Sequence, residues 1–252
     1  MKLSVIIPTY NEENYIADCL QSLMKQTEKP DEIIVVDNNS TDKTAEIAKT
    51  FPGVKVVNEK KQGMIPARNK GFDSAQYDII ARTDADTIVP KNWIKRIKKH
   101  FADEKIVGVS GPARFVGLDA VRTSAYWRSE LLFFRSFRRM LGYNTLFGPN
   151  MALRASAWKK IRRVVCLSDS AVHEDVDLGI HLSSVGTTDF DRKLVVTSSS
   201  RRWKHIAPHF EYPYRYIKTI QLHNKYFLAL KKHTKRIRTM IQASLKNPLQ
   251  SL

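Results

Sequence analysis

The sequence predicts an α/β fold, in which a mostly parallel, Rossmann-like sheet is flanked by helices. Short β-branched runs alternate with amphipathic segments over residues 1–105. The run 32–37, Glu-Ile-Ile-Val-Val-Asp, is too short for a helix and is apolar on both faces, as a central parallel strand requires. Regular alternation of such runs with helical segments is typical of a parallel sheet covered on both faces.

The expected elements follow from periodicity and from helix caps. Helical spacing begins at Tyr15, and Ser40-Thr41-Asp42 are typical caps for a helix that Pro52-Gly53 would close. Beyond residue 105 the alternation fades, and the basic stretch after Pro213 has roughly helical spacing. We expect strands over residues 3–7, 32–37, 54–57, 78–82, 106–110 and 194–197, and further helices over 67–75 and 119–141.

Positive charge is concentrated in two parts of the chain. The net charge is +17, and residues 201–252 hold 12 Lys and Arg against a single acid, Glu211. Residues 122–163 hold ten more against Glu130. A localised excess indicates a surface that meets a polyanion: a nucleic acid, an anionic membrane or a phosphorylated substrate.

Other features indicate the cellular setting. No apolar run approaches the roughly 18–20 residues that span a bilayer, and the N-terminus lacks a secretory pattern. We therefore expect a cytoplasmic protein, with peripheral attachment to the inner face of the cell membrane as an alternative. Cys19 and Cys166 lie in apolar surroundings, where reduced, buried thiols are expected.

Polar clusters follow three of the expected strands. They comprise residues 8–12, 37–40 and 84–86. Ligands bind beyond the carboxyl ends of parallel strands, so these clusters should form one site. Asp84 and Asp86 would repel each other unless a cation compensated, and a hard divalent ion that bridges substrate phosphates commonly does so. Asn38, Asn39 and Ser40 are equally compatible with turn and cap positions.

Five characteristic segments appear in a fixed order: Pro8–Glu13, Val36–Asp42, Ala67–Gly71, Thr83–Thr87 and Glu174–Leu178. Together they resemble the family 2 glycosyltransferases. The resemblance implies the nucleotide-binding GT-A fold and inversion of the anomeric centre, and it does not reach beyond about Pro208. We expect a catalytic domain over 1–210, with a nucleotide-binding half (1–105) and an acceptor-binding half (106–210), and a basic amphipathic tail over 211–252.

The resemblance also implies roles for single residues. Asp175 matches the general base, and Glu174 would orient Asp175 or the acceptor. Asp86 and Asp84 match the DXD pair that holds Mg²⁺ or Mn²⁺ on the diphosphate. The alternative is that Glu174, Asp175 and Asp177 form the acidic first turn of a helix, which the helix dipole favours. The expected nucleotide-sugar contacts are Pro8, Thr9, Tyr10, Glu12, Asp37, Asn39, Arg68, Asp84, Asn150 and Arg202.

Three further residues carry weaker signals. Arg202-Trp203 resembles part of a motif of processive members, but Ser199 stands where that motif has Gln or Arg, so processive synthesis is not expected. His205 and His209 stand four apart and could approach the diphosphate or metal, although surface histidines are commoner at such spacing.

These observations predict an inverting transfer from a UDP- or GDP-sugar to a hydroxyl or lipid-phosphate acceptor in glycan or cell-envelope assembly. The expected partners are the donor, a glycan or polyprenyl-phosphate-linked acceptor and, through the tail, an anionic membrane, with no nucleic acid. The alternative is a basic nucleic-acid- or membrane-binding module without catalysis, which the acidic clusters oppose. A dinucleotide oxidoreductase would need G-x-G-x-x-G after the first strand, and a nucleotidyltransferase a glycine-rich triphosphate loop; residues 8–13 are neither.

Overall fold

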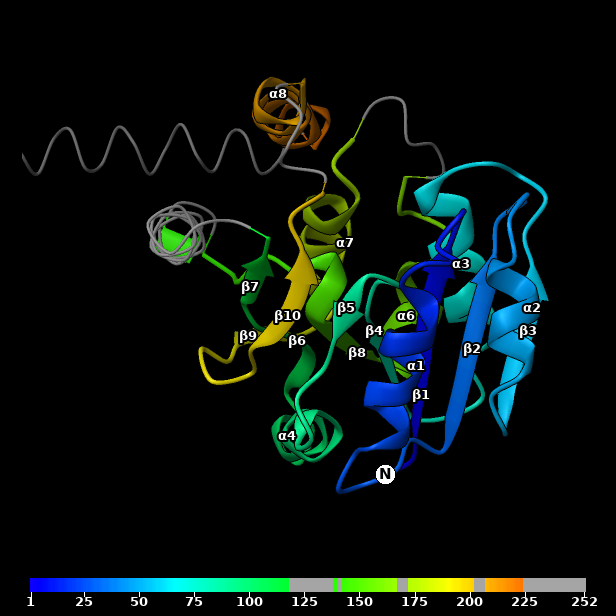
Figure 1. Ribbon diagram of the computed structural model, residues 1–252. Coiled ribbons are helices and arrows are strands. Elements are labelled where there is room, and N and C mark those ends of the chain that lie inside the picture. The colour runs from blue at the N-terminus through cyan, green and yellow to red at the C-terminus, as the bar shows by residue number, and fades with distance from the viewer. Residues whose placement is uncertain (118–137, 140–141, 167–171, 202–206, 224–252) are drawn as a thin grey trace, which may run out of the picture.

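The computed structural model describes residues 1–117, 138–139, 142–166, 172–201 and 207–223, which form an α/β structure of two sheets with helices packed around them (Figure 1). The large sheet contains β1 (Leu3–Thr9), β2 (Glu32–Asp37), β3 (Val54–Asn58), β4 (Ile79–Arg82), β6 (Ile106–Ser110), β8 (Met151–Arg154) and β9 (Thr187–Phe190). The small sheet contains β5 (Thr87–Ile88), β7 (Ala113–Val116) and β10 (Val196–Ser199).

Strand order follows from the pairing. The large sheet runs β3-β2-β1-β4-β8-β6-β9, and β8 is antiparallel to both of its neighbours while the other pairs are parallel. The predicted mostly parallel sheet is therefore confirmed. In the small sheet β10 lies between β5 and β7.

Helices cover both faces of the large sheet. One core contains side chains from α1 (Ile16–Met24), α2 (Thr44–Lys49) and α4 (Trp93–His100), together with inward residues of the small sheet. The other contains α3 (Met64–Ser74), α6 (Ala155–Ile161) and α7 (Glu174–Ser183). Strands β1 and β4 are buried along their whole length, as their apolar sequences predict.

Helix α3 begins three residues earlier than expected, at Met64. Asn38 holds the chain that leads into it: its amide donates to the carbonyls of Glu59 and Lys61, and its Oδ1 accepts from the Gly63 amide. Helix α2 ends at Lys49, before the expected Pro52-Gly53 stop. The N-cap position is Lys43, which makes no side-chain cap hydrogen bond, so the predicted caps at residues 40–42 lie one or more residues before it; Asp42 Oδ1 accepts from the Thr44 amide at 2.9 Å.

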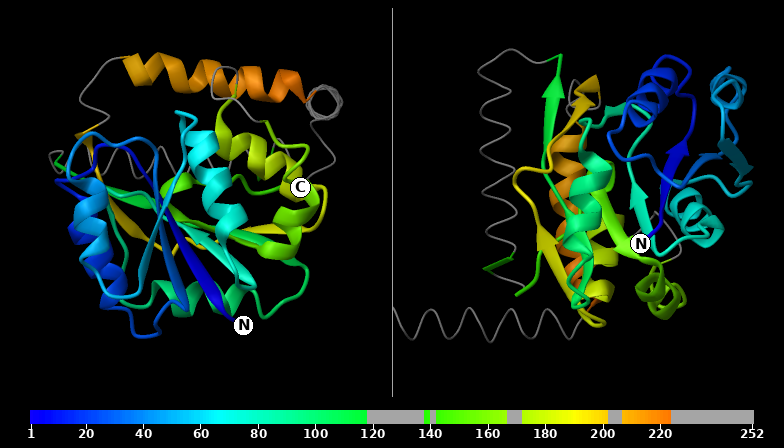
Figure 2. Two further views of the ribbon diagram at one scale, coloured as in Figure 1. Left: turned by 90° about the vertical axis from the view of Figure 1, so that its right-hand side faces the viewer. Right: turned by 90° about the horizontal axis from the view of Figure 1, so that it is seen from below.

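Helix α8 (Ala207–Leu222) crosses the top of the molecule (Figure 2) and packs on α7. It begins before Pro213 rather than after it, and it spans residues 210 and 211, where the basic tail is expected to begin. The expected helix over 119–141 and the tail beyond 223 lie almost entirely outside the described residues. Within the described part of the chain, no helix is long and apolar enough to cross a membrane.

The two cysteines are free but differ in exposure. Cys19 is buried, as predicted, whereas Cys166 is only partly buried because it lies in the segment after α6 rather than in a core element.

Strand register brings the polar clusters to one edge. Thr9 pairs with Asp37, and Ile6 pairs with Arg82, so residues 10–12, 38–40 and 84–86 leave the sheet side by side. Antiparallel β8 starts at the same edge, because Met151 pairs with Arg82, and the 3₁₀ turn η1 (Gly148–Asn150) precedes it.

Candidate active site

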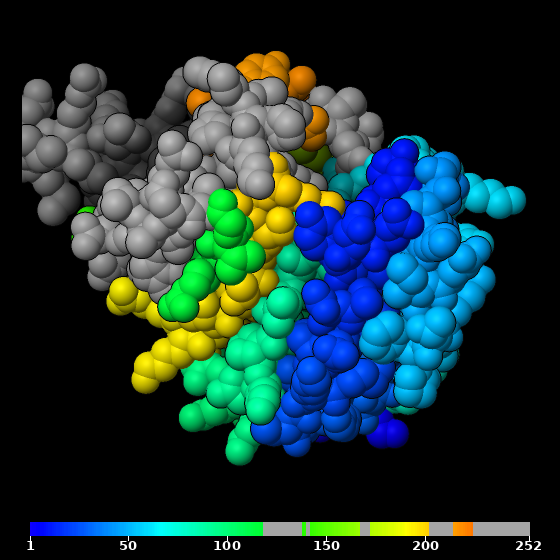
Figure 3. All heavy atoms as spheres, viewed as in Figure 1, coloured from blue at the N-terminus to red at the C-terminus, as the bar shows by residue number. Residues whose placement is uncertain are grey.

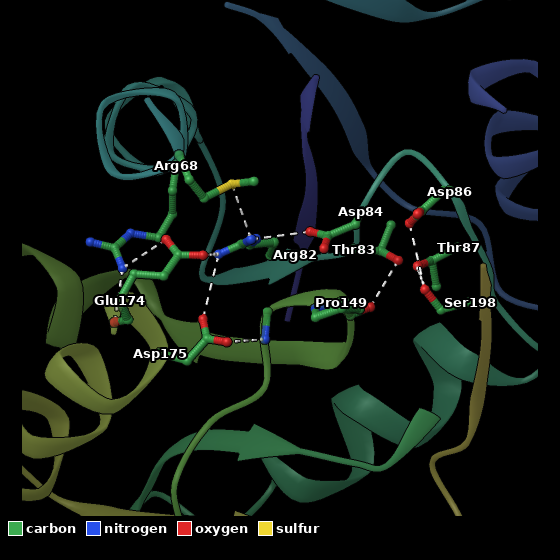
Figure 4. A network of polar contacts seen from close by, with 12 residues as sticks. Arg68, Arg82, Thr83, Asp84, Asp86, Thr87, Pro149, Glu174, Asp175 and Ser198 are labelled. Atoms are coloured by element: carbon green, nitrogen blue, oxygen red, sulfur yellow. Dashed lines mark hydrogen bonds and ion pairs between the residues drawn. The ribbon is translucent and has the colours of Figure 1, made fainter. Parts of the chain in front are cut away.

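Arg82 lies at the centre of the site. Its side chain is almost fully buried at the end of β4, yet three carboxylates surround it (Figure 4). Nη1 lies 2.7 Å from Oε1 of Glu174 and 3.7 Å from Oδ1 of Asp175, and Nη2 lies 3.1 Å from Oδ1 of Asp84. One guanidinium thus joins the expected DXD segment to the acidic start of α7.

Arg68 supports the same cluster from α3. Its Nη1 donates to the Glu174 carbonyl at 3.2 Å and lies 3.4 Å from Glu174 Oε2, while Nε and Nη2 donate to Asn69. Its side chain is fully buried, so it cannot reach a ligand in this arrangement. In this structure Arg68 compensates Glu174, and its predicted contact with the nucleotide-sugar stays a prediction.

The carboxylates of Glu174 and Asp175 differ in environment. Burial opposes the ionisation of Glu174, but Arg82 and Arg68 beside it hold its pKa below the ordinary value. Burial, and then the charge of Glu174, raise the pKa of Asp175 to about 7. Asp175 Oδ2 accepts a 2.8 Å hydrogen bond from the Gly148 amide. A Cβ at Gly148 would lie 2.9 Å from Arg82 Nη2, so the close approach of η1 requires glycine. A carboxyl group with a pKa near neutrality is suited to general-base chemistry.

Asp84 and Asp86 contact different partners (Figure 4). Asp84 turns toward Arg82, whereas Asp86 turns toward the small sheet, where its Oδ1 is 3.5 Å from the hydroxyl of Ser198. Thr87 Oγ1 donates to the same Ser198 hydroxyl at 3.1 Å. The pair therefore spans the junction between the two sheets.

Arg201 closes the Asp86 side of the site. Its Nε lies 3.2 Å from Asp86 Oδ2, its Nη2 contacts Glu12 Oε1, and its guanidinium lies 4.6 Å from the ring centroid of Tyr15. Burial raises the pKa of Glu12 while Arg201 lowers it, and the charges of Asp86 and Asp84 raise it further. In Figure 3 the residues after β1 (blue) and the end of β10 (yellow) meet on the same face.

The nucleotide side of the edge is formed by the ends of β1 and β2. Pro8 and Thr9 are buried in β1, and the Thr9 hydroxyl donates to the Val36 carbonyl at 3.0 Å. Tyr10 follows with half of its surface exposed. Asp37 is partly buried and accepts from the Ser40 amide at 3.3 Å.

Asn39 and Asn150 have structural bonding partners. Asn39 has a left-handed backbone (φ 64) and donates to Lys60 O and Gln62 Oε1, which fixes the neighbouring loop. Asn150 is fully buried: its Oδ1 accepts from the Trp93 indole at 2.8 Å, and its amide donates to the carbonyls of Pro112 and Leu194. The expectation that Asn150 faces a sugar or acceptor pocket is wrong, because every polar atom of its side chain is used in the interior.

The structure brings together most of the expected site residues and adds three. Arg82, Ser198 and Arg201 were assigned no role from sequence, although Arg82 directly precedes the DXD segment. Arg202 and His205 lie outside the described residues; His209 lies in α8, and its side chain is not among those described.

The carboxylates of this edge fit a hard divalent cation. The charges of Asp84 and Asp86 lie close enough to Glu12 to raise its pKa. Arg201 forms ion pairs with Glu12 and Asp86. Buried Glu12 Oε2 has no hydrogen-bond partner among the described residues. Oxygen donors with excess negative charge are what Mg²⁺ and Mn²⁺ prefer.

Comparison with known proteins gives one family. The model of glycosyl transferase family 2 matches residues 4–162, and 27% of residues are identical over 197 positions to an uncharacterized glycosyltransferase of Haemophilus influenzae. That alignment covers 73% of this chain and 61% of the relative, so the chain spans less than two thirds of that relative's length. A second relative, the uncharacterized glycosyltransferase YibD of Escherichia coli, is 40% identical over 89 residues, which are 34% of this chain and 26% of the relative.

Solved structures share the fold. The mannosyltransferase PcManGT of Pyrobaculum calidifontis, in complex with GDP-Man and Mn²⁺, superposes with a TM-score of 0.62 over 97% of this chain and 75% of that chain, at 21% identity. TarS 1-349 of S. aureus, in complex with UDP-GlcNAc, gives 0.58 over 80% and 59% of the two chains, at 22% identity. The α/β architecture is therefore that of the GT-A glycosyltransferases.

Proposed function

The chain belongs to the family 2 glycosyltransferases, and from this premise we propose that it transfers the sugar of a UDP- or GDP-linked donor to a hydroxyl or lipid-phosphate acceptor, with inversion at the anomeric carbon. One of the two solved complexes contains a GDP-sugar and the other a UDP-sugar, so both bases remain within the proposal.

A single observation carries the proposal: Arg82 contacts both the DXD residue Asp84 and the buried acids at the start of α7. The donor-side carboxylate and the proposed base are thereby held on one guanidinium. Transfer with inversion needs one base on the acceptor side of the anomeric carbon. Asp175 supports that role because it is buried, with its pKa raised to about 7, and is fixed by the Gly148 amide.

The proposed mechanism assigns each acid one task. Mg²⁺ or Mn²⁺ held by Asp86 and Asp84 would supply positive charge to the leaving diphosphate. Asp175 accepts the proton of the acceptor hydroxyl while that oxygen bonds to the anomeric carbon and the bond to the diphosphate breaks. Glu174, kept ionised by Arg82 and Arg68, stays a hydrogen-bond acceptor and orients the acceptor or Asp175.

The nucleoside is proposed to bind over the ends of β1 and β2. The exposed ring of Tyr10 offers a surface for the base, and the Asp37 carboxylate can accept from a base N–H. Pro8 and Thr9 shape the floor through their buried backbone.

The acceptor is proposed to reach the site from a membrane surface. Helix α8 exposes Tyr214, Ile217 and Leu222, each more than half accessible, and Lys218 lies over the Tyr214 ring at 5.6 Å. Aromatic, aliphatic and basic side chains on one amphipathic helix suit the interface of an anionic bilayer. Sedimentation of the full chain with phosphatidylglycerol vesicles should fall when Tyr214 and Ile217 are both replaced by Ser; unchanged sedimentation would remove α8 from this role.

The donor-site experiment compares Asp86→Asn with Asp73→Asn, a surface carboxylate bonded to Trp158 and Arg162. Thermal shifts are measured with UDP and with GDP, in the presence and absence of Mn²⁺, because a ligand stabilises in proportion to ln(1 + [L]/Kd). The native chain and Asp73→Asn should show a Mn²⁺-dependent shift with one nucleotide. If Asp86→Asn shows the same shift, the proposed metal site is wrong.

The base is tested separately. Asp175→Asn should keep the Mn²⁺-dependent nucleotide shift while sugar transfer, followed as nucleotide release, falls by roughly 10²–10⁴-fold. Loss of nucleotide binding together with transfer would move Asp175 out of the base role and into donor binding.

A further inference from the structure

A second group of metal-ligating side chains lies behind the site, between α7 and α8. It consists of Asp177 and His181 on α7, His223 directly after α8, and Cys166 in the segment after α6. The ligand atoms of Cys166, Asp177 and His223 all lie within 4.8 Å of one another. Asp177 and His181 stand four apart on one helix face, and the proposed mechanism uses none of the four residues.

Three of the ligand atoms converge on one point. His223 Nε2 lies 3.1 Å from Asp177 Oδ1 and 3.1 Å from His181 Nε2, and His181 Nε2 lies 3.5 Å from Asp177 Oδ1. Zinc bound tetrahedrally at about 2.0–2.1 Å from nitrogen or oxygen separates neighbouring ligand atoms by about 3.3 Å. The observed separations lie on either side of that value.

Hydrogen bonding fixes the state of His223. Its Nδ1 lies 2.8 Å from the Thr219 carbonyl, which can only accept, so Nδ1 carries the ring proton. In the neutral form of this ring, Nε2 would present a lone pair toward Asp177 and His181, which is the form that a metal ion binds. A histidine whose other nitrogen donates to a backbone carbonyl is the arrangement that orients metal-bound imidazoles.

The Asp177 carboxylate gives a second, independent indication of a bound cation. Its side chain is fully buried, and its Oδ1 has no hydrogen-bond partner among the described residues, although Oδ2 accepts from the Cys166 amide at 3.0 Å. The Nε2 atoms of His223 and His181 lie 3.1 and 3.5 Å from this oxygen, so either a ring proton or a bound cation between these atoms would satisfy it. Burial of an unsatisfied carboxylate oxygen is costly, and a cation placed between these atoms would remove the cost.

We propose that Cys166, Asp177, His181 and His223 form a structural zinc site, distinct from the oxygen-ligated metal of the donor site. One thiolate, one carboxylate and two neutral imidazoles would balance the charge of Zn²⁺, and sulfur with nitrogen selects zinc over Mg²⁺ or Mn²⁺. Binding forms the Zn–S bond as the Cys166 thiol releases its proton to solvent, with no change in oxidation state.

The site would fix the helix that carries the proposed base. Glu174 and Asp175 occupy the first turn of α7, and Asp177 lies in the same helix. Besides this group, Ile220 packs on Val176 and Ile180, and the Tyr216 ring stacks at 4.2 Å on His173, the residue before α7. A metal that joins α7, α8 and the segment after α6 would hold these elements together.

The first test uses the native full chain. After purification without added metal and dialysis against EDTA-free buffer, elemental analysis should find zinc in stoichiometric amount. Replacement by Co²⁺ should give the ultraviolet thiolate-to-cobalt charge-transfer band, and zinc should protect Cys166 from iodoacetamide, as read by peptide mass spectrometry. Native protein with neither bound zinc nor a cobalt band on titration would overturn the proposal.

Variants locate the site. Cys166→Ala should abolish the charge-transfer band, and His223→Gln should weaken zinc affinity by more than roughly tenfold. Asp86→Asn, at the donor site, should retain both the zinc and the band. Retention of the band in Cys166→Ala, or its loss only in Asp86→Asn, would contradict the assignment. Circular dichroism of each variant verifies folding, and the native-chain measurements do not depend on any variant.

Discussion

Arg82 and Glu174 are joined by a 2.7 Å contact between Nη1 and Oε1, although they stand 92 residues apart in the chain. The guanidinium side chain is 2% exposed and the carboxylate side chain 14%. A pair so far from water depends on both partners, because removal of Arg82 leaves Glu174 with only the Arg68 ion pair among the described residues, and leaves Asp84 and Asp175 without their ion pairs to Arg82.

Replacement of Arg82 by Met should therefore lower the free energy of unfolding by about 3–5 kcal/mol. Glu174, Asp84 and Asp175 would lose their shared cation. Urea denaturation measures the change, and Arg162→Met is the matched control because Arg162 and its partner Asp73 are both largely exposed. The control should stay within about 1 kcal/mol of the native chain. Equal losses in the two variants would show that the buried ion pair contributes no more to the free energy of unfolding than the exposed one.

The pH dependence of transfer should follow Asp175. With its pKa raised to about 7, the carboxylate is protonated below neutrality and cannot accept the acceptor proton. We expect kcat/KM to fall about tenfold per pH unit below that value and to level above it. A profile that stays flat down to pH 5, measured at saturating Mn²⁺, would contradict the assignment of the base.

The raised pKa of Asp175 also predicts that ionisation of this carboxyl group, which transfer requires, destabilises the folded protein. A carboxyl group whose folded pKa is raised favours the folded state when it is protonated, and that contribution is lost as pH rises through the folded value. Asp175→Asn should thus unfold at a higher temperature than the native chain at pH 8, with the difference shrinking toward pH 4. Scanning calorimetry at the two pH values measures it. A difference that does not change with pH would mean that only packing had changed.

Periodicity and burial made much of the fold predictable. The strands at 32–37 and 106–110 were predicted with the observed bounds, because a buried strand has a nearly continuous apolar run in its interior, here Ile33–Val36 and Ile106–Val109. The short strands of the small sheet were largely missed, since β5 and β7 have little apolar signal of their own. The start of α3 was also misplaced, because Asn38 sets it from 25 residues away, which no local pattern shows.

The site residues that belong to sequence motifs were predictable. Residues whose position or bonding depends on tertiary contacts were not. The residues expected at the sheet edge do gather there, because strand register carries them. Arg82 ends an apolar strand, where a buried cation is not expected, and only the three acids around it explain its position. Asn150 has an amide side chain of the kind that often binds ligands, but all its polar atoms form hydrogen bonds with the Trp93 indole and two backbone carbonyls.

Gly71→Ala tests the packing of α3 on the sheet. A Cβ at Gly71 would lie 2.1 Å from Cγ2 of Ile6 and 3.0 Å from Cγ2 of Val36, so the helix must shift away from β1 and β2. Overpacking of this kind costs about 1–3 kcal/mol, which urea denaturation should resolve. Gly53→Ala is the contrasting variant: its Cβ meets nothing within 4 Å, and any cost comes from its φ of +74. In a double-mutant cycle, Gly71→Ala should cost less in an Ile6→Ala background, which lacks Cγ2, than in the native chain; an equal cost in both backgrounds would place the strain elsewhere.

Arg201→Ala should tighten the binding of Mn²⁺ to the nucleotide-free protein severalfold. The guanidinium lies 3.2 Å from Asp86 Oδ2 and also contacts Glu12, so it competes with a metal for the same carboxylates. Without it the two acids repel each other, and the variant should melt at a lower temperature than the native chain until Mn²⁺ is added. Calorimetric titration and thermal shift measure the two effects. Arg192→Ala removes the same charge from an exposed position, and equal tightening there would mean that Mn²⁺ senses only the net charge of the protein.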